Sequence, residues 1–77
     1  MIEAYVLIQT KIGKVQGVAA EASRIAGVAT AAVVAGPYDV VARVAADDIG
    51  SLAKLVVARI QTIDGVTRTL TCPILHL

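Results

Sequence analysis

A short pattern that ends a helix and begins a strand occurs twice in this chain, half the chain apart. The first copy is Ile25-Ala26-Gly27-Val28-Ala29-Thr30, and the second is Ile63-Asp64-Gly65-Val66-Thr67-Arg68-Thr69. In each copy a glycine follows the helix-patterned residues, and glycine accepts the left-handed conformation with which many helices end. A doubled strand–helix–strand unit is compatible with only a small set of folds. The repeat therefore predicts one domain over residues 1–77, built from two such units.

Hydrophobic periodicity predicts three strands and one helix in the first two thirds of the chain. Alternation over 2–10 indicates a strand. A helix is expected from Gly13 to about Ala26, because its apolar residues recur at helical spacing. These residues are Val15, Val18, Ala19, Ala22 and Ile25. Strands over 28–35 and 38–46 follow, and the Gly36-Pro37 turn between them predicts an antiparallel hairpin.

A second helix and a last strand complete the expected order. Asp47 and Asp48 each offer a side-chain cap for the helix. Its expected buried face is marked by Leu52, Leu55, Val56, Arg59, Ile60 and Ile63. The last strand is expected over 66–77, and Pro73 indicates an edge or a bulge near its end because proline donates no hydrogen bond to a ladder.

This order is that of the α+β, ferredoxin-like βαββαβ fold. In that fold two helices cover one face of a four-stranded antiparallel sheet, and the other face is open. Here the open face would carry small and branched apolar side chains, and the chain as a whole is 57% hydrophobic. An exposed apolar sheet face is an association surface. The sequence therefore predicts a homodimer that packs sheet against sheet, as a dimeric α+β barrel.

Composition argues against several classes of protein. The net charge is +1 with the basic residues scattered singly, so direct nucleic-acid binding is not expected. No uncharged apolar run is long enough to cross a membrane, and the N-terminus has no secretory signal pattern. A single cysteine excludes an intrachain disulfide. We expect a soluble, cytoplasmic protein.

Residues suited to catalysis or metal binding are few. Cys72 and His76 share a face of the last strand, but two isolated ligands do not make a metal site. They are also too far apart along a strand to act as nucleophile and base. The expected roles are a buried cysteine and a terminal histidine in solvent. We therefore expect no metal, no cofactor and no enzyme activity.

Two segments remain open to a binding role. Gly36-Pro37-Tyr38-Asp39 is explained as a hairpin turn, but turn amides could also hold the carboxylate of a small zwitterion and Asp39 its ammonium group. The row Thr67, Thr69 and Thr71 is explained as a solvent-facing strand, but it could also supply hydroxyls to a ligand cleft. Spacing alone does not choose between these interpretations.

Both segments resemble a known family. The run from Gly36 to Val44, an Asp-led helix, and the run from Ile63 to Thr69 resemble the ligand-binding domain of the Lrp/AsnC ("feast/famine") transcription regulators, also called RAM. The family pattern is Gly-x-aromatic-Asp before an apolar strand, and later Pro-Gly-Val before a Thr-rich strand. Asp64 stands in place of the usual Pro. The resemblance covers essentially the whole chain.

The resemblance implies a fold, an assembly and a ligand. Family domains have the fold derived above, dimerise through their sheets and often form octamers. A small amino acid binds between dimers, which would place Gly36, Tyr38 and Asp39 against Thr67, Thr69 and Thr71. Pro37 stands where many members have a polar or acidic residue. No helix-turn-helix precedes the first strand, so the resemblance implies a stand-alone effector domain that binds amino acids itself or enters mixed oligomers with full-length regulators.

Two other classes share this element order. A small dimeric α+β barrel enzyme of the monooxygenase or isomerase type would need polar residues projecting into a cavity, and this chain has few. An ACT-like regulatory domain also binds amino acids, but its glycine follows the first strand, a position that Gly13 could imitate. The pairing of the turn motif with the threonine row favours the first interpretation.

Overall fold

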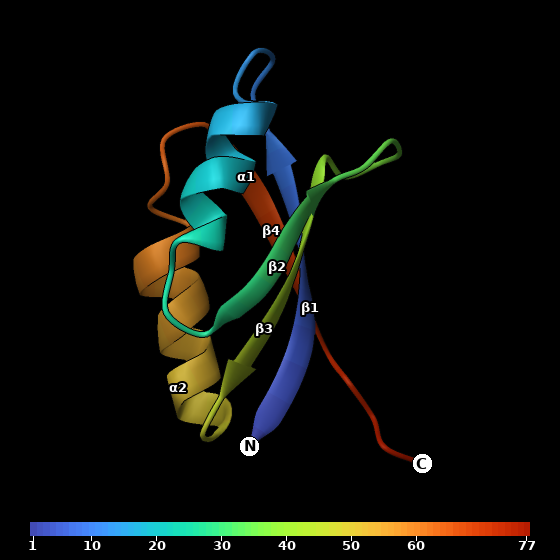
Figure 1. Ribbon diagram of the computed structural model, residues 1–77, viewed down its shortest axis with the longest axis vertical. Coiled ribbons are helices and arrows are strands. Elements are labelled where there is room, and N and C mark those ends of the chain that lie inside the picture. Colours follow the sequence, from blue (N-terminus) through green and yellow to red (C-terminus); the bar gives the residue numbers. More distant parts are fainter.

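A computed structural model describes residues 1–77 and confirms the ferredoxin-like arrangement. The elements are β1 (Ile2–Thr10), α1 (Val15–Ser23), β2 (Val28–Val33), β3 (Val40–Ala46), α2 (Ile49–Lys54), a π-helical continuation η1 (Leu55–Ile60) and β4 (Val66–Pro73). The strands form one antiparallel sheet in the order β2-β3-β1-β4. The helices lie together on one face of this sheet (Figure 1).

The core lies between the sheet and the helices, where the alternation predicted it. Alternate residues of the two central strands point into it, and β1 contributes Ala4, Val6 and Ile8, all fully buried. The helices contribute residues that include Val18 and Ile60, also fully buried. Burying a side chain of this size stabilises the fold by roughly 1.5–3 kcal/mol. No polar or charged residue is buried among them, so the core holds no candidate site.

The second helical segment differs from a regular helix. Its N-terminus is capped as predicted, because Asp48 Oδ1 accepts a hydrogen bond from the Ser51 amide at 2.7 Å. Asp47 makes no such bond. From Leu55 the chain widens into a π-helix, and the Gln61 amide donates to the Val56 carbonyl at 2.8 Å. No π-helical turn was predicted, since nothing in the residue pattern marks one.

Several elements are shorter than predicted. The first helix was expected to reach about Ala26 and ends at Ser23, and the hairpin strands end at Val33 and begin at Val40. The last strand was expected to reach Leu77, but it ends at Pro73. Pro73 lies opposite Ala4, so β1 has almost no residues left to pair with the chain beyond it. The last residues accordingly run away from the sheet (Figure 1).

The sheet face away from the helices is open and largely apolar. Tyr5 and Leu70 are 41% and 47% exposed there. Cys72 pairs with Tyr5 on this face and is exposed, which corrects the expectation of a buried cysteine.

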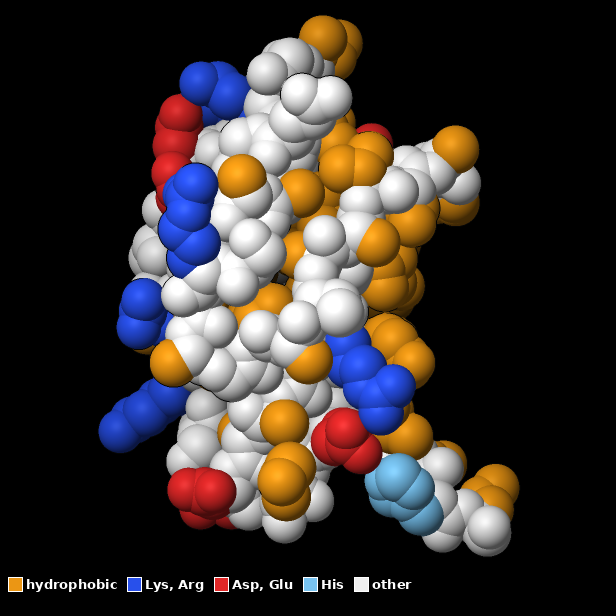
Figure 2. Space-filling view, in the orientation of Figure 1, with side chains coloured by type: hydrophobic (Ala, Val, Ile, Leu, Met, Phe, Trp, Pro, Cys, Tyr) orange, Lys and Arg blue, Asp and Glu red, His pale blue; other side chains and the backbone are white.

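Arg43 Nη2 lies 3.0 Å from Glu3 Oε2, and the Arg43 guanidinium carbon lies 5.8 Å from the centre of the Tyr5 ring. Figure 2 shows hydrophobic side chains gathered on the sheet side of the molecule, whereas most basic side chains lie on the helix side.

None of the helices is long and apolar enough to span a membrane.

Candidate functional site

The hairpin turn between β2 and β3 is fastened to the end of β1 by Asp39. Its carboxylate Oδ2 accepts hydrogen bonds from the Thr10 amide at 2.8 Å and the Thr10 hydroxyl at 3.2 Å. Its own amide donates to the Ile8 carbonyl at 2.9 Å. The other carboxylate oxygen, Oδ1, has no partner within the protomer. Asp39 therefore shapes the turn and keeps one oxygen available to a cation.

The other two candidate residues of the turn are Gly36 and Tyr38. Gly36 is exposed and has a φ of 153°. Tyr38 is partly exposed beside Asp39. The Gln9 amide group donates to the Pro37 carbonyl at 3.2 Å, which adds a second link between the turn and β1. Hydrogen bonds from Gln9 and Thr10 thus hold the turn against the end of β1.

The three threonines of β4 do not share one environment. The Thr67 hydroxyl donates to the Gln9 carbonyl at 3.1 Å, where a register shift leaves Thr67 unpaired opposite β1. Thr69 Oγ1 accepts a hydrogen bond from Gln61 Nε2 at 2.9 Å. Thr71 lies opposite Val6 and therefore faces the helices. The row predicted from spacing is interrupted by the bulge at its first member.

The structure brings one residue of each predicted segment to the same end of β1. Asp39 bonds to Thr10, and Thr67 bonds to the neighbouring Gln9. The turn and the start of β4 therefore flank a single strand end. Thr69 and Thr71 lie progressively further along β4, on its helix side.

Two grooves, each of about 420 Å³, follow β4. One is lined by Gln61, Val66, Thr67, Arg68 and Thr69, and is mostly polar. The other is mostly apolar and is lined by residues of α2, η1 and β4 that include Gln61, Thr69 and Thr71. Neither groove includes Gly36, Tyr38 or Asp39. One protomer therefore does not enclose the turn residues and the threonines in one cavity.

Three residues of this region are not predicted as site residues by the sequence pattern. Gln9, Thr10 and Gln61 each contact the turn or a candidate threonine. The available signal was that Gln9 and Thr10 are polar residues that end an apolar strand. Which residues they contact depends on strand register, which the sequence pattern does not specify.

A separate, exposed ion pair lies at the loop that leads into β4. Lys14 Nζ lies 3.0 Å from Asp64 Oδ2, and the hydrogen bond from Lys14 lowers the pKa of the Asp64 carboxyl. Asp64 is the residue that replaces the proline of the family pattern. The ion pair links the start of α1 to the helix end where that proline would stand.

Comparisons with known proteins agree with the fold. The family model for the Lrp/AsnC ligand binding domain matches residues 3–76. TTHA0845 from Thermus thermophilus is 35% identical with a TM-score of 0.94, over 100% of this chain and 96% of that one. No protein among those with curated descriptions matches the sequence.

Two further solved structures share the fold at lower identity. AsnC of E. coli is 23% identical with a TM-score of 0.91, over 99% of this chain and 52% of that one. The transcriptional regulator NMB0573 from Neisseria meningitidis, solved as an L-Met complex, is 14% identical with a TM-score of 0.86, over 97% and 50%. This chain thus spans about half of each. Because the family model covers nearly every residue, the chain belongs to the Lrp/AsnC ligand-binding domain family.

Proposed function

We propose that this domain is a cytoplasmic effector-binding and oligomerisation module that modulates transcription and has no enzyme activity. Its effector is a small amino acid, bound between dimers by Gly36, Tyr38 and Asp39 on one side and Thr67, Thr69 and Thr71 on the other. It acts either in assemblies of this chain alone or in mixed oligomers with full-length Lrp/AsnC regulators. Contact with DNA in such mixed assemblies belongs to the full-length partner.

The observation that carries this proposal is the arrangement at the end of β1. Asp39 and Thr67 bond to the consecutive residues Thr10 and Gln9, so groups from both candidate segments are presented at one end of the sheet. The free Asp39 oxygen suits an ammonium group, and the turn amides suit a carboxylate. The Thr69 hydroxyl also suits a carboxylate, because it accepts from Gln61 and keeps its own hydrogen to donate. An amino acid carries both groups on one carbon.

A second protomer is needed because the turn residues line no groove with the threonines. A site closed by the threonine face of a neighbouring copy would supply the missing wall. L-Met in the complex of the related fold, NMB0573, is a ligand of this chemical class. Pro37 has no amide hydrogen to donate, so the turn has one donor fewer for a carboxylate than a turn without proline.

The open sheet face supports dimerisation. It exposes Tyr5, Leu70 and Cys72 on neighbouring strands. Apolar surface of this kind is stabilised when a second sheet covers it. We propose homodimers that pack face to face, assembled further into octamers.

The binding site is tested by calorimetric titration of the protein with each common amino acid, repeated on the Asp39→Asn variant. The asparagine side chain keeps an oxygen that can accept from Thr10 but lacks the charge that would hold an ammonium group. We expect one amino acid to bind the unmodified protein and to bind the variant at least about tenfold more weakly. If no amino acid bound the variant more weakly than the unmodified protein, the assignment of Asp39 would be contradicted and a site elsewhere, such as the loop at Gly13, would be favoured.

A further inference from the structure

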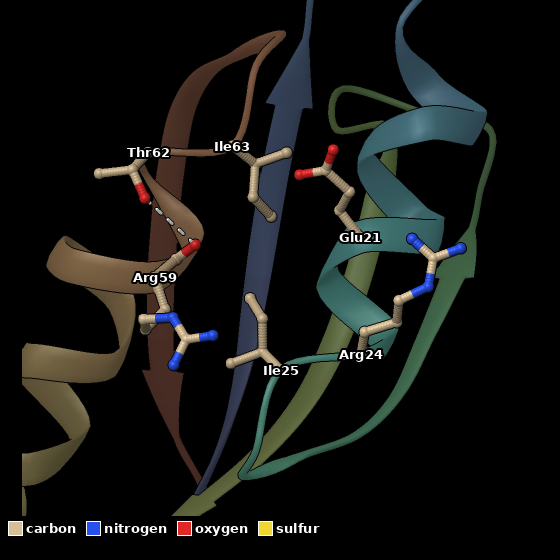
Figure 3. A pocket seen from close by; sticks show the side chains of 6 residues that line it. All are labelled: Glu21, Arg24, Ile25, Arg59, Thr62 and Ile63. Atoms are coloured by element: carbon tan, nitrogen blue, oxygen red, sulfur yellow. Dashed lines mark hydrogen bonds between the residues drawn. The ribbon is translucent and has the colours of Figure 1, made fainter.

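A separate groove lies between the two helices, on the layer opposite the open sheet face (Figure 3). It holds about 310 Å³ and is lined by Glu21, Arg24, Ile25, Arg59, Thr62 and Ile63. Ile25 and Ile63 are 7% and 8% exposed and give it an apolar floor. Because the groove is on the helix side, a partner sheet on the open face would leave it accessible.

Two opposite charges face this groove without pairing. The Glu21 carboxylate is directed from α1 toward Ile63, and the Arg59 guanidinium is directed from η1 toward Ile25, whereas Arg24 extends outward at the rim (Figure 3). The ion pairs of the protein join Lys14 to Asp64, and Arg43 and His76 to Glu3. Glu21 and Arg59 are in none of them. A carboxylate and a guanidinium thus stand apart across an apolar floor.

The Thr62 hydroxyl adds a polar group to the lining of this groove. It donates to the Ala58 carbonyl at 2.9 Å, and this leaves its oxygen lone pairs to accept. Pockets that enclose small molecules have volumes from about 300 Å³ upward. The groove is therefore of a size for one small ligand with separate cationic, anionic and apolar parts.

We propose that this groove binds a zwitterionic amino acid with an apolar side chain. Arg59 holds the carboxylate, Glu21 holds the ammonium group, and the apolar side chain lies on Ile25 and Ile63. The site lies within one protomer, so it needs no second copy of the chain to complete it. It shares no residue with the inter-dimer site proposed above and does not depend on it.

The test follows the methyl resonances of Ile25 and Ile63 by NMR during titration with L-leucine. Two analogues each lack one charge: 4-methylpentanoate has no ammonium group, and 3-methylbutylamine has no carboxylate. We expect leucine to shift both methyl signals and to bind at least about tenfold more tightly than either analogue, since each lost charge removes a charge-assisted hydrogen bond.

Variants assign the two charges separately. Glu21→Gln is expected to weaken leucine about tenfold and to leave 4-methylpentanoate binding unchanged. Arg59→Gln is expected to weaken leucine equally and to leave 3-methylbutylamine binding unchanged. Lys54→Gln removes an exposed cation of the same helical segment that does not line the groove, so it should bind leucine as the unmodified protein does.

The outcomes separate this proposal from the inter-dimer site. Leucine shifts at Ile25 and Ile63 that persist in Asp39→Asn and vanish in the two groove variants support it. Shifts confined to Tyr38 and Thr69 would overturn it and leave the inter-dimer site standing. No shift at Ile25 and Ile63 up to millimolar leucine, or equal leucine binding by Glu21→Gln, would also overturn it.

Discussion

Thr10 and Asp39, 29 positions apart in the sequence, are joined by two hydrogen bonds to a single carboxylate oxygen. The Thr10 amide and hydroxyl both donate to Asp39 Oδ2, at 2.8 and 3.2 Å. This contact fixes the β2–β3 turn against the end of β1. Asp39 therefore has a structural role in addition to the ligand contact proposed for it.

Asp39→Ala should destabilise the fold by about 1–3 kcal/mol, because the partly buried Thr10 amide loses its acceptor. Urea unfolding at neutral pH measures the loss. Asp47→Ala is the matched control, since Asp47 is an exposed acid with no side-chain hydrogen bond, and it should change stability by less than about 0.5 kcal/mol. Equal stability of the two variants would contradict the structural role of Asp39.

Gly65→Ala should be strongly destabilising. Gly65 has a φ of +100°, and a Cβ atom there would lie 2.6 Å from Lys14 Cβ. A strained backbone and an overlap of this kind cost on the order of 1–3 kcal/mol. Gly17→Ala is the matched control in α1, where a Cβ atom would meet nothing within 4 Å, and it should stabilise by about 0.5–1 kcal/mol. Thermal unfolding distinguishes them, and a harmless Gly65→Ala would argue against this packing of the helix end on α1.

Acid should weaken the fold partly through Asp48 and Asp64. The hydrogen bond from the Ser51 backbone amide lowers the pKa of Asp48, and the bond from Lys14 lowers the pKa of Asp64. A carboxyl with a lowered folded pKa contributes stability that is present above its unfolded pKa of about 3.9 and is lost as pH falls through the folded value.

The measurement is the unfolding midpoint in urea at several values between about pH 6 and pH 2. The stability of the Asp48→Ala and Asp64→Ala variants should fall less steeply below about pH 4 than that of the unmodified protein. A parallel decline in all three would show that these two carboxylates do not contribute to the acid dependence.

Leu70→Glu should weaken the proposed sheet-to-sheet dimer on the order of a hundredfold or more, because it would place an unpaired charge within the covered face. Sedimentation velocity over a range of concentrations measures the dissociation constant. Val57→Glu is the control, since Val57 is 59% exposed on the helix layer, and it should leave the dimer unchanged. Dimerisation unaffected by Leu70→Glu would place the interface elsewhere.

The fold was predictable because its strongest signals are local. The alternation of β1 put Ala4, Val6 and Ile8 on one face, and all three are buried. Gly27 and Gly65 both have positive φ, as the repeat indicated, although α1 ends at Ser23 and η1 at Ile60, several residues earlier. The π-helical turn was not predictable, since it depends on how the second helix packs. The early end of β4 was not predictable either, since it depends on where its partner strand β1 begins.

The candidate site was predictable only in its parts. The turn motif and the threonines could be recognised from residue type, but their relation could not, because it depends on strand register. Register places Thr10 beside Asp39 and Gln9 beside Thr67, and it places Thr69 where Gln61 reaches it. The exposure of Cys72 has the same origin, since it lies opposite Tyr5 on the open face.

The proposed function requires that this domain assembles and that a small amino acid acts on the assembly. Its most direct test is the mass measured by light scattering after size exclusion, with and without each common amino acid. We predict a dimer or a larger species whose mass shifts with one amino acid. A monomer under all conditions would contradict the dimer, and an assembly of constant mass with every amino acid would contradict the effector role.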